Sequence, residues 1–149
     1  MIEIKETIEL FESNLAILSS LFDKGYAPNK GTLVPPTRVL PEGYEIRFVN
    51  NMDVSVAITF YQIAEGEDFF RVFVYGDNKK SFNLFNWLKY HEQVSDRSIF
   101  KFSQFSGNFS SQLKQLLARI NLFLSDDSLE PILNGESWEE IPFDWAGMR

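Results

Sequence analysis

The sequence contains one histidine, His91, in the run Lys89-Tyr90-His91-Glu92. Histidine is the side chain that most often serves as a general base near neutral pH. A single histidine beside one glutamate is weak evidence for catalysis, and at the end of a predicted helix its more frequent role is to interact with the last carbonyl groups. We therefore predict no catalytic residue.

Metal binding would have to use carboxylates, because the sequence has no cysteine. Asp126, Asp127 and Glu130 are the closest group of candidates. The spacing Asp127-x-x-Glu130 is also that of a capping box at the start of a helix, with Asp in place of Ser or Thr. We take capping as the interpretation, and we expect neither a metal nor a cofactor. The sequence has no Gly-rich phosphate loop, no Gly-x-Ser-x-Gly and no His-Glu-x-x-His.

The end of the chain combines large aromatic side chains with carboxylates. Tryptophan is enriched at the centres of protein interfaces, and charge opposite to that of the partner accelerates association. We therefore predict a partner-binding surface made of Trp138, Glu139, Glu140, Phe143, Asp144 and Trp145. The alternative is that the rings close over the end of the sheet or of a helix pair, with only the carboxylates in water.

The charge distribution indicates what kind of partner to expect. The net charge is −7, yet residues 1–124 hold 14 acidic and 13 basic side chains, whereas residues 125–148 hold seven acidic ones and no Lys or Arg. A negative field repels nucleic-acid phosphates and attracts basic surfaces. We expect a protein partner, basic in character, and no direct nucleic-acid binding. The alternative is a solvated acidic end that serves solubility.

Length and composition predict one domain, residues 1–149, that includes an acidic, Trp-containing C-terminal segment, residues 125–149. The absence of cysteine fits a reducing compartment. The first residues lack the pattern of a secretory signal, and no apolar run approaches the roughly 20 residues of a membrane span. These features predict a cytoplasmic protein that does not bind membranes.

Two helices are predicted from apolar periodicity. The first covers Glu3 to Asp23, with apolar side chains on one face at Ile4, Ile8, Phe11, Leu15, Leu18 and Phe22. The second follows Asn108, a predicted N-cap, and has apolar side chains on one face at Phe109, Leu113, Leu116, Leu117, Ile120, Phe123 and Leu124. A shorter helix is expected to begin at Ser81 as its cap.

Alternating apolar residues predict three strands, at residues 44–48, 54–60 and 69–75, joined as an antiparallel meander. Residues 98–105 suggest a fourth strand. The connection from Tyr26 to Gly43 holds four prolines, which permit no more than a short edge strand at Thr37 to Leu40. The predicted fold is therefore α+β, an antiparallel meander of three to four strands packed against an N-terminal and a C-terminal helix.

The segment Gly135-Glu136-Ser137-Trp138, followed by residues 141–145, is similar to the tail of small bacterial proteins, and the whole chain resembles the immunity proteins of bacterial toxin systems. The likeness covers size, charge and fold class over the chain, with a specific motif only at residues 135–145, so no contact residue is carried over. It implies a cytosolic domain that binds and blocks a toxin, frequently a basic nuclease.

The expected function is that of a non-enzymatic protein-binding module, an immunity or inhibitor protein that neutralises a basic toxin. The alternative is a small enzyme or small-ligand-binding protein whose aromatic-lined pocket lies between the meander and the helices. The toxin class and the oligomeric state stay open at this point.

Overall fold

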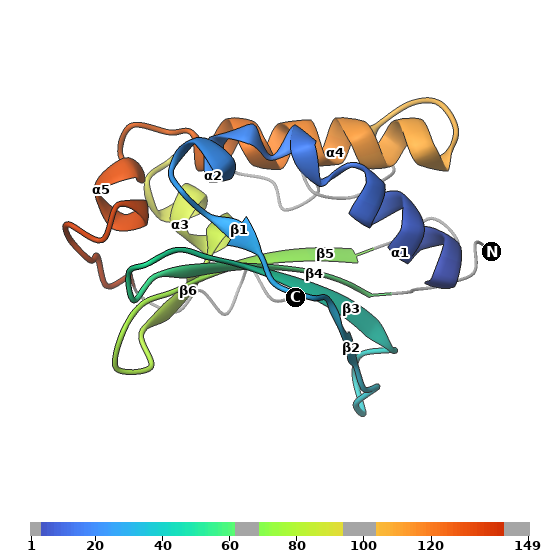
Figure 1. Ribbon diagram of the computed structural model, residues 1–149, viewed down its shortest axis with the longest axis horizontal. Coiled ribbons are helices and arrows are strands. Elements are labelled where there is room, and N and C mark those ends of the chain that lie inside the picture. Colours follow the sequence, from blue (N-terminus) through green and yellow to red (C-terminus); the bar gives the residue numbers. More distant parts are fainter. Residues whose placement is uncertain (1–3, 62–68, 94–103, 142–149) are drawn as a thin grey trace.

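The computed structural model describes residues 4–61, 69–93 and 104–141. It shows two layers, an antiparallel sheet and a set of helices that lie on one side of it (Figure 1). The α+β prediction is confirmed, and the sheet has six strands rather than three or four. These are β1 (Ala27–Pro28), β2 (Thr32–Val34), β3 (Gly43–Val49), β4 (Ser55–Tyr61), β5 (Phe69–Tyr75) and β6 (Ser81–Asn83).

The order of strands is β1-β3-β4-β5-β6, and β2 pairs with the other end of β3. The three predicted strands form the centre of this sheet, where Ile46 pairs with Ile58 and Ile58 with Val72. The fourth strand of the meander is β6, which the sequence had assigned to a helix cap. The strand predicted at residues 98–105 lies largely outside the described residues.

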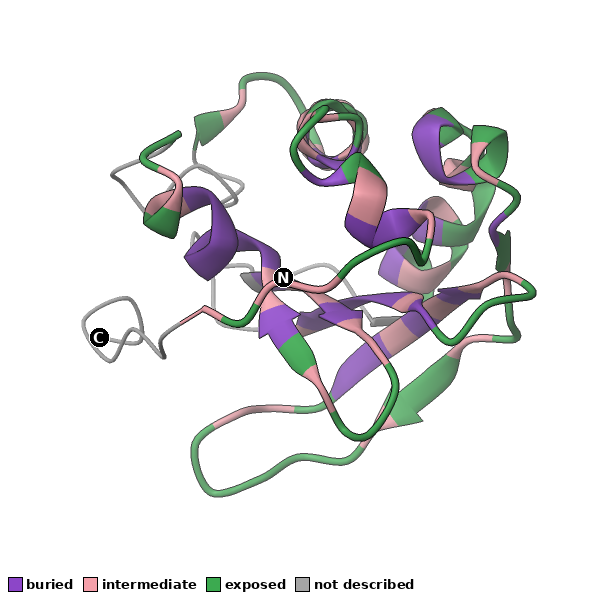
Figure 2. Cartoon of the chain, turned by 90° about the vertical axis from the view of Figure 1, so that its left-hand side faces the viewer, coloured by how far each residue is buried: buried purple, intermediate pink, exposed green. Residues whose placement is uncertain are grey.

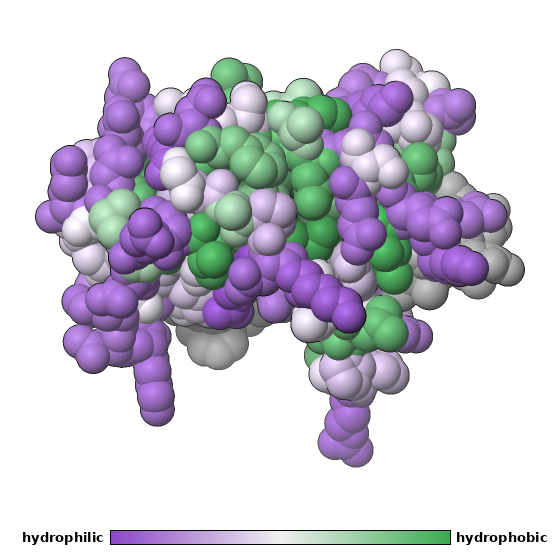
Figure 3. Space-filling model, in the orientation of Figure 1, coloured by the Kyte–Doolittle hydropathy of each residue, from purple (hydrophilic) through white to green (hydrophobic). Residues whose placement is uncertain are grey.

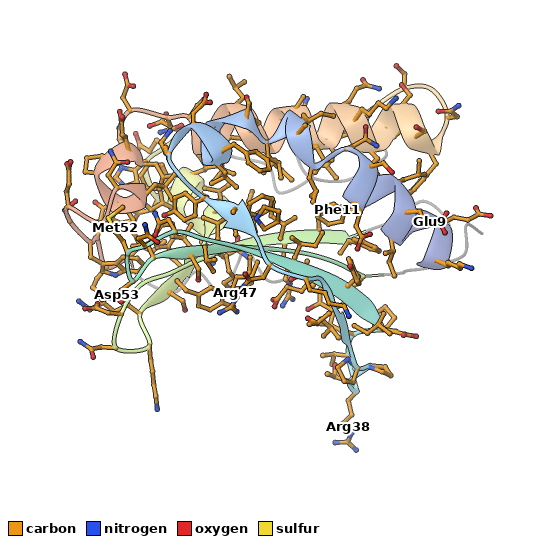
Figure 4. All side chains as sticks on the ribbon, viewed as in Figure 1. Glu9, Phe11, Arg38, Arg47, Met52 and Asp53 are labelled. Carbon is orange, nitrogen blue, oxygen red and sulfur yellow. The ribbon has the colours of Figure 1, made fainter. Side chains whose placement is uncertain are left out.

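Alternate side chains of the strands face the helices and form the core. Those of β3 and β4 are Tyr44, Ile46, Phe48, Val56, Ile58 and Phe60, and all are buried (Figure 2). Phe11 points from the first helix toward the sheet (Figure 4) and packs its ring 5.5 Å from that of Phe60 and 5.8 Å from that of Phe70. Such tilted aromatic pairs add to the stabilisation that burial of apolar surface already supplies.

The predicted N-terminal helix is interrupted, which corrects the sequence interpretation. It consists of α1 (Ile4–Ser13), a 3-10 turn η1 (Leu15–Ile17) and α2 (Ser19–Asp23). The interruption follows from polar side chains that bond back to the helix: Ser13 Oγ donates to Glu9 O and Asn14 Nδ2 to Leu10 O. Phe22, placed in the sequence on the buried face, is 40% exposed, and Leu21 is buried instead.

The C-terminal helix α4 (Phe109–Leu124) is confirmed together with its cap, because Asn108 Oδ1 accepts a hydrogen bond of 2.9 Å from Ser111 N. Its buried residues are Leu113, Leu116, Leu117, Ile120 and Leu124. Asn121 of α4 also holds α2, since its Oδ1 accepts from Ser20 N at 2.8 Å. No helix in the described part of the chain is long and apolar enough to cross a membrane.

The short helix after Ser81 begins later than predicted. Ser81 lies in β6, and α3 (Leu84–Tyr90) is capped by Asn83, whose Oδ1 accepts from Phe85 N at 2.8 Å. A last helix, α5 (Glu130–Leu133), follows α4. The capping box predicted at Asp127 is absent there, because the N-cap is Leu129 and it is Asp126 that accepts a bond from Ser128 N.

The segment between β2 and β3 projects away from the sheet, and we call residues 32–43 the arm (Figure 1). The edge strand predicted at Thr37 to Leu40 is wrong, since these residues form the tip of the arm. The tip is closed by Thr37 N donating to Leu40 O at 2.8 Å and by Leu40 N donating to Thr37 Oγ1 at 3.0 Å.

The sheet face away from the helices carries arginines and aromatic rings. The guanidinium of Arg47 lies 4.4 Å from the ring centre of Tyr75, and that of Arg71 lies 5.7 Å from the ring centre of Tyr61. Burial raises the pKa of the Tyr75 hydroxyl, while Arg47 acts in the opposite direction. The two arginines are thus engaged in cation–π contacts with rings of the sheet.

Candidate partner-binding site

Helix α5 positions the acidic C-terminal segment. Leu129, Ile132 and Leu133 are buried in the core, and the Tyr26 hydroxyl donates a 2.7 Å hydrogen bond to Leu133 O. The helix ends at Leu133, and Gly135 beyond its C-cap has φ 74°, a conformation that other residues rarely adopt. Glu136 N then donates to Pro131 O at 2.9 Å, which closes the turn. The chain leaving α5 is therefore directed by a buried helix and a fixed turn.

Glu139 attaches this segment to α3. Its Oε1 atom accepts a hydrogen bond of 3.0 Å from Trp87 Nε1 and lies 2.5 Å from His91 Nε2. The rings of Trp87 and His91 have centres 4.3 Å apart and are tilted by 38° to each other, so one carboxylate oxygen contacts two adjacent rings. The trio links two parts of the chain about 50 residues apart in sequence, and it leaves Glu139 only partly accessible.

Trp138 packs against the end of the sheet. Its ring centre lies 5.3 Å from that of Phe82 in β6, and the residue is half-buried against the core. A Cβ atom on Gly76, in the turn after β5, would lie 2.8 Å from Trp138 Cζ3. Glycine at this position thus leaves the space that the indole occupies.

Beside Trp138 the surface is hollowed by about 430 Å³. Three segments line this hollow: the β3–β4 turn, the β5–β6 turn and the chain after α5. We call it the acidic hollow, and its lining residues are Met52, Asp53, Val54, Gly76, Asp77, Lys80, Gly135, Glu136, Ser137 and Trp138. Met52 and Asp53 mark its place at one end of the sheet in Figure 4.

The charge of the acidic hollow is negative. Asp53, Asp77 and Glu136 are all exposed at its rim, and the cation among the lining residues is Lys80, whose Nζ is 3.9 Å from Asp77 Oδ1. An indole beside carboxylates is an arrangement that attracts an ammonium or guanidinium group, through the ring face and through opposite charge. The hollow can therefore hold a cationic side chain.

The six residues predicted to bind a partner divide into two groups. Trp138 is half-buried at the hollow, Glu139 is bound to α3, and Glu140 is exposed. Phe143, Asp144 and Trp145 lie outside the described residues. The ring of Trp138 packs on the core, as the alternative interpretation of the tail expected, and it also lines the hollow. Partner binding by all six residues stays a prediction.

Sequence reasoning missed Asp53, Asp77 and Gly76 as members of the site. Asp53 lies in the turn between β3 and β4, and Asp77 in the turn between β5 and β6. No signal in the sequence brings them to residues 135–138, because that proximity depends on the sheet order and on the path of the chain after α5. The meander alone predicts only that the turns carrying Asp53 and Asp77 lie at the same end of the sheet.

His91 has a carboxylate neighbour, as the enzyme hypothesis requires. The same carboxylate oxygen is shared with Trp87, however, and His91 does not line the acidic hollow. The backbone N–H of His91 donates to Trp87 O at 3.1 Å, so the residue also ends α3. Within residues 4–61, 69–93 and 104–141, no three His, Asp or Glu side chains are grouped so as to hold a metal ion.

Comparison with known proteins finds no match, whether against models of protein families, curated proteins or solved structures.

Proposed function

We propose that this protein is a protein-binding module without enzymatic activity, and that it covers a basic surface of its partner with the acidic hollow and the adjacent C-terminal segment. The observation that carries the proposal is the meeting of Asp53, Asp77 and Glu136 around a half-buried Trp138. These side chains come from three segments, so a concave and negative surface is built by the fold rather than by a run of acidic sequence.

The energetics of interfaces support this role. A tryptophan already packed on Phe82 loses little conformational freedom on binding, which lowers the entropic cost of association. Glu139 adds to this, because its bonds to Trp87 and His91 fix the backbone next to Trp138. The carboxylates at the rim would mainly raise the rate of association with a cationic partner.

The partner class we propose is a basic toxin, which the chain would neutralise as an immunity or inhibitor protein in the cytoplasm. The support is the resemblance in size, charge and tail motif, together with a composition that excludes disulfide bonds. A domain that blocks a basic protein needs a negative, preformed surface, and the acidic hollow has both properties.

The test is affinity capture from the native host at two salt concentrations, followed by measurement of binding kinetics with the captured protein. A hollow variant, Asp53→Asn with Asp77→Asn and Glu136→Gln, is expected to slow association by about tenfold or more and to weaken its salt dependence. The tail variant Glu139→Gln with Glu140→Gln and Asp144→Asn tests the predicted sequence motif in the same way.

The matched control removes three exposed carboxylates elsewhere, with Glu6→Gln, Glu9→Gln and Asp23→Asn on α1 and α2. It removes the same number of negative charges, three, and should bind with nearly unchanged kinetics. If the control and the hollow variant slowed association equally, only the total charge of the protein would matter for binding. Unchanged capture by the hollow variant at both salt concentrations would exclude the hollow as the binding surface.

A small enzyme or ligand-binding protein remains the competing proposal, and the pair His91–Glu139 is the feature that favours it. The aromatic side chains expected to line its pocket are instead packed on one another in the core, with Tyr44 and Phe60 ring centres 5.9 Å apart. The protein-binding proposal therefore explains more of the described surface.

A further inference from the structure

The arm carries apolar and cationic side chains that the fold leaves exposed. Val39 is 86% exposed and Leu33 58% exposed, and Arg38 lies beside Val39 at the end of the arm. Figure 4 shows Arg38 extending from the arm into solvent, and Figure 3 shows a hydrophobic region on the arm with a hydrophilic end below it. The arm thus presents a chemistry complementary to an apolar pocket with an acidic rim.

The backbone of the arm is restricted by prolines, by hydrogen bonds at its tip and by strand pairing at its base. Pro35, Pro36 and Pro41 restrict its backbone, and the hydrogen bonds between Thr37 and Leu40 close its tip. At its base Leu33 pairs with Tyr44 in the sheet. A backbone restricted in this way loses less entropy when it enters a partner, which favours binding.

The acidic hollow has the chemistry that the tip requires. Its walls include Met52, Val54 and Trp138, and its rim carries Asp53, Asp77 and Glu136. At about 430 Å³ it falls within the usual range of binding pockets, roughly 300–1,000 Å³. Leu33 and Val39 are apolar, like the side chains of the walls. Arg38 carries the charge opposite to that of the rim.

The arm and the hollow of one molecule lie at opposite ends of the same strand. The arm runs into β3 at Gly43, whereas the turn that carries Met52 and Asp53 follows the last residue of β3, Val49. A strand of seven residues spans about 20 Å. The arm cannot fold back into its own hollow across that distance, so the complementary partner is another molecule.

We propose that the arm of one molecule docks in the acidic hollow of a second copy of this chain, with Arg38 at the carboxylates and Val39 against the apolar wall. Such a contact is head-to-tail, which permits rings or open chains of molecules. A single arm tip buries little area, so the association is weak and is weakened further by salt. This inference does not rest on the proposed function, although docking would cover the surface proposed for the partner.

The test uses two variants of the full chain whose substitutions all lie at exposed positions. The arm variant is Arg38→Ser with Val39→Ser, and the charge-reversed hollow variant is Asp53→Lys with Glu136→Lys. Sedimentation velocity over roughly 10–500 µM would follow the oligomeric state at low salt. Circular dichroism and urea unfolding check that each variant is folded.

The proposal predicts that the wild type associates as its concentration rises and that each variant alone stays monomeric. A mixture of the two should form a one-to-one dimer that grows no further, because one variant supplies a working arm and the other a working hollow. A matched control, Lys30→Ser with Leu122→Ser, also removes an exposed cation and an exposed apolar side chain and should associate as the wild type does.

Three results would overturn the proposal: a wild type that is monomeric over the whole range, an arm variant that associates like the wild type, or a mixture that stays monomeric. Partner capture separates this proposal from the proposed function. The arm variant should still bind the partner. The charge-reversed hollow variant should lose both the binding of the partner and the association with a second copy.

Discussion

At the scale of single residues, Glu139 shows how a residue predicted to face a partner also stabilises the fold. Its carboxylate accepts the N–H of Trp87, whose side chain is otherwise fully buried. A buried donor that loses its acceptor is costly, because water cannot replace the bond. The charge of the tail was evident from the sequence, but the attachment of one of its carboxylates to α3 was not.

We predict that Glu139→Ala lowers the free energy of unfolding by about 1–3 kcal/mol, because Trp87 Nε1 is left without an acceptor. Urea denaturation would measure the change. Glu140→Ala is the control, since Glu140 is exposed and its truncation should cost no more than about 0.5 kcal/mol. Equal effects of the two substitutions would show that the bond to Trp87 does not matter for stability.

Tyr26 gives a second residue-scale prediction, on pH dependence. Burial raises the pKa of its hydroxyl to about 12, and Asn50 offsets part of that rise. Since an unfolded tyrosine has a pKa near 10, the contribution of Tyr26 is complete below about pH 10 and is lost as the pH rises toward 12.

Between pH 9 and pH 11, Tyr26 should therefore account for a fall of about 1.4 kcal/mol in the free energy of unfolding. Urea denaturation of the wild type and of Tyr26→Phe at both pH values isolates this part. The variant loses the bond to Leu133 O and should be less stable at pH 9, but its stability should fall less with pH. Parallel pH curves for the two proteins would refute the assignment.

At the scale of elements, the three central strands and α4 could be predicted from their apolar patterns. The alternation in residues 54–60 places Val56, Ile58 and Phe60 on the side of β4 that faces the helices, although Ala57 and Thr59 on the other side are buried as well. Asn108 marks the start of α4 correctly. The N-terminal helix could not be predicted in full. Its apolar spacing continues past Asn14, whereas the helix is interrupted there because the side chain of Asn14 bonds Leu10 O, and α2 is held by the remote side chain of Asn121.

Asn121 caps α2 although it is 101 residues from Ser20 in sequence, so no local pattern reveals the contact. We predict that Asn121→Ala lowers the free energy of unfolding by about 1 kcal/mol, since Ser20 N loses its acceptor. Leu122→Ala, at the neighbouring exposed position, should change it by no more than about 0.5 kcal/mol. Urea denaturation of the two variants decides the matter, and an Asn121 variant as stable as the wild type would contradict the capping role.

The short elements were the least predictable. Strand β6 has three residues, too few to show a period, and the arm has no regular pattern because its prolines determine its path. The roles of β6 and of the arm follow from where they lie in the folded molecule. Phe82 of β6 supports Trp138, and the arm carries its exposed tip away from the sheet.

At the scale of the whole molecule, the negative surface is an assembly rather than a property of the tail. The sequence places the excess of carboxylates at residues 125–148, yet Asp53 and Asp77 join Glu136 only because both turns lie at the same end of the sheet as the chain after α5. We propose that this assembly, with Trp138, binds a cationic side chain of another protein.

That claim is tested most directly by an NMR titration of the isotope-labelled protein with an arginine-containing peptide and with the same peptide carrying citrulline, which keeps the shape of arginine but has no charge. We predict that the arginine peptide shifts the amide signals of Gly76 and Gly135 and the indole signal of Trp138, and that the citrulline peptide does so far less. Shifts of equal size with both peptides, or arginine-dependent shifts confined to residues away from the acidic hollow, would contradict the account.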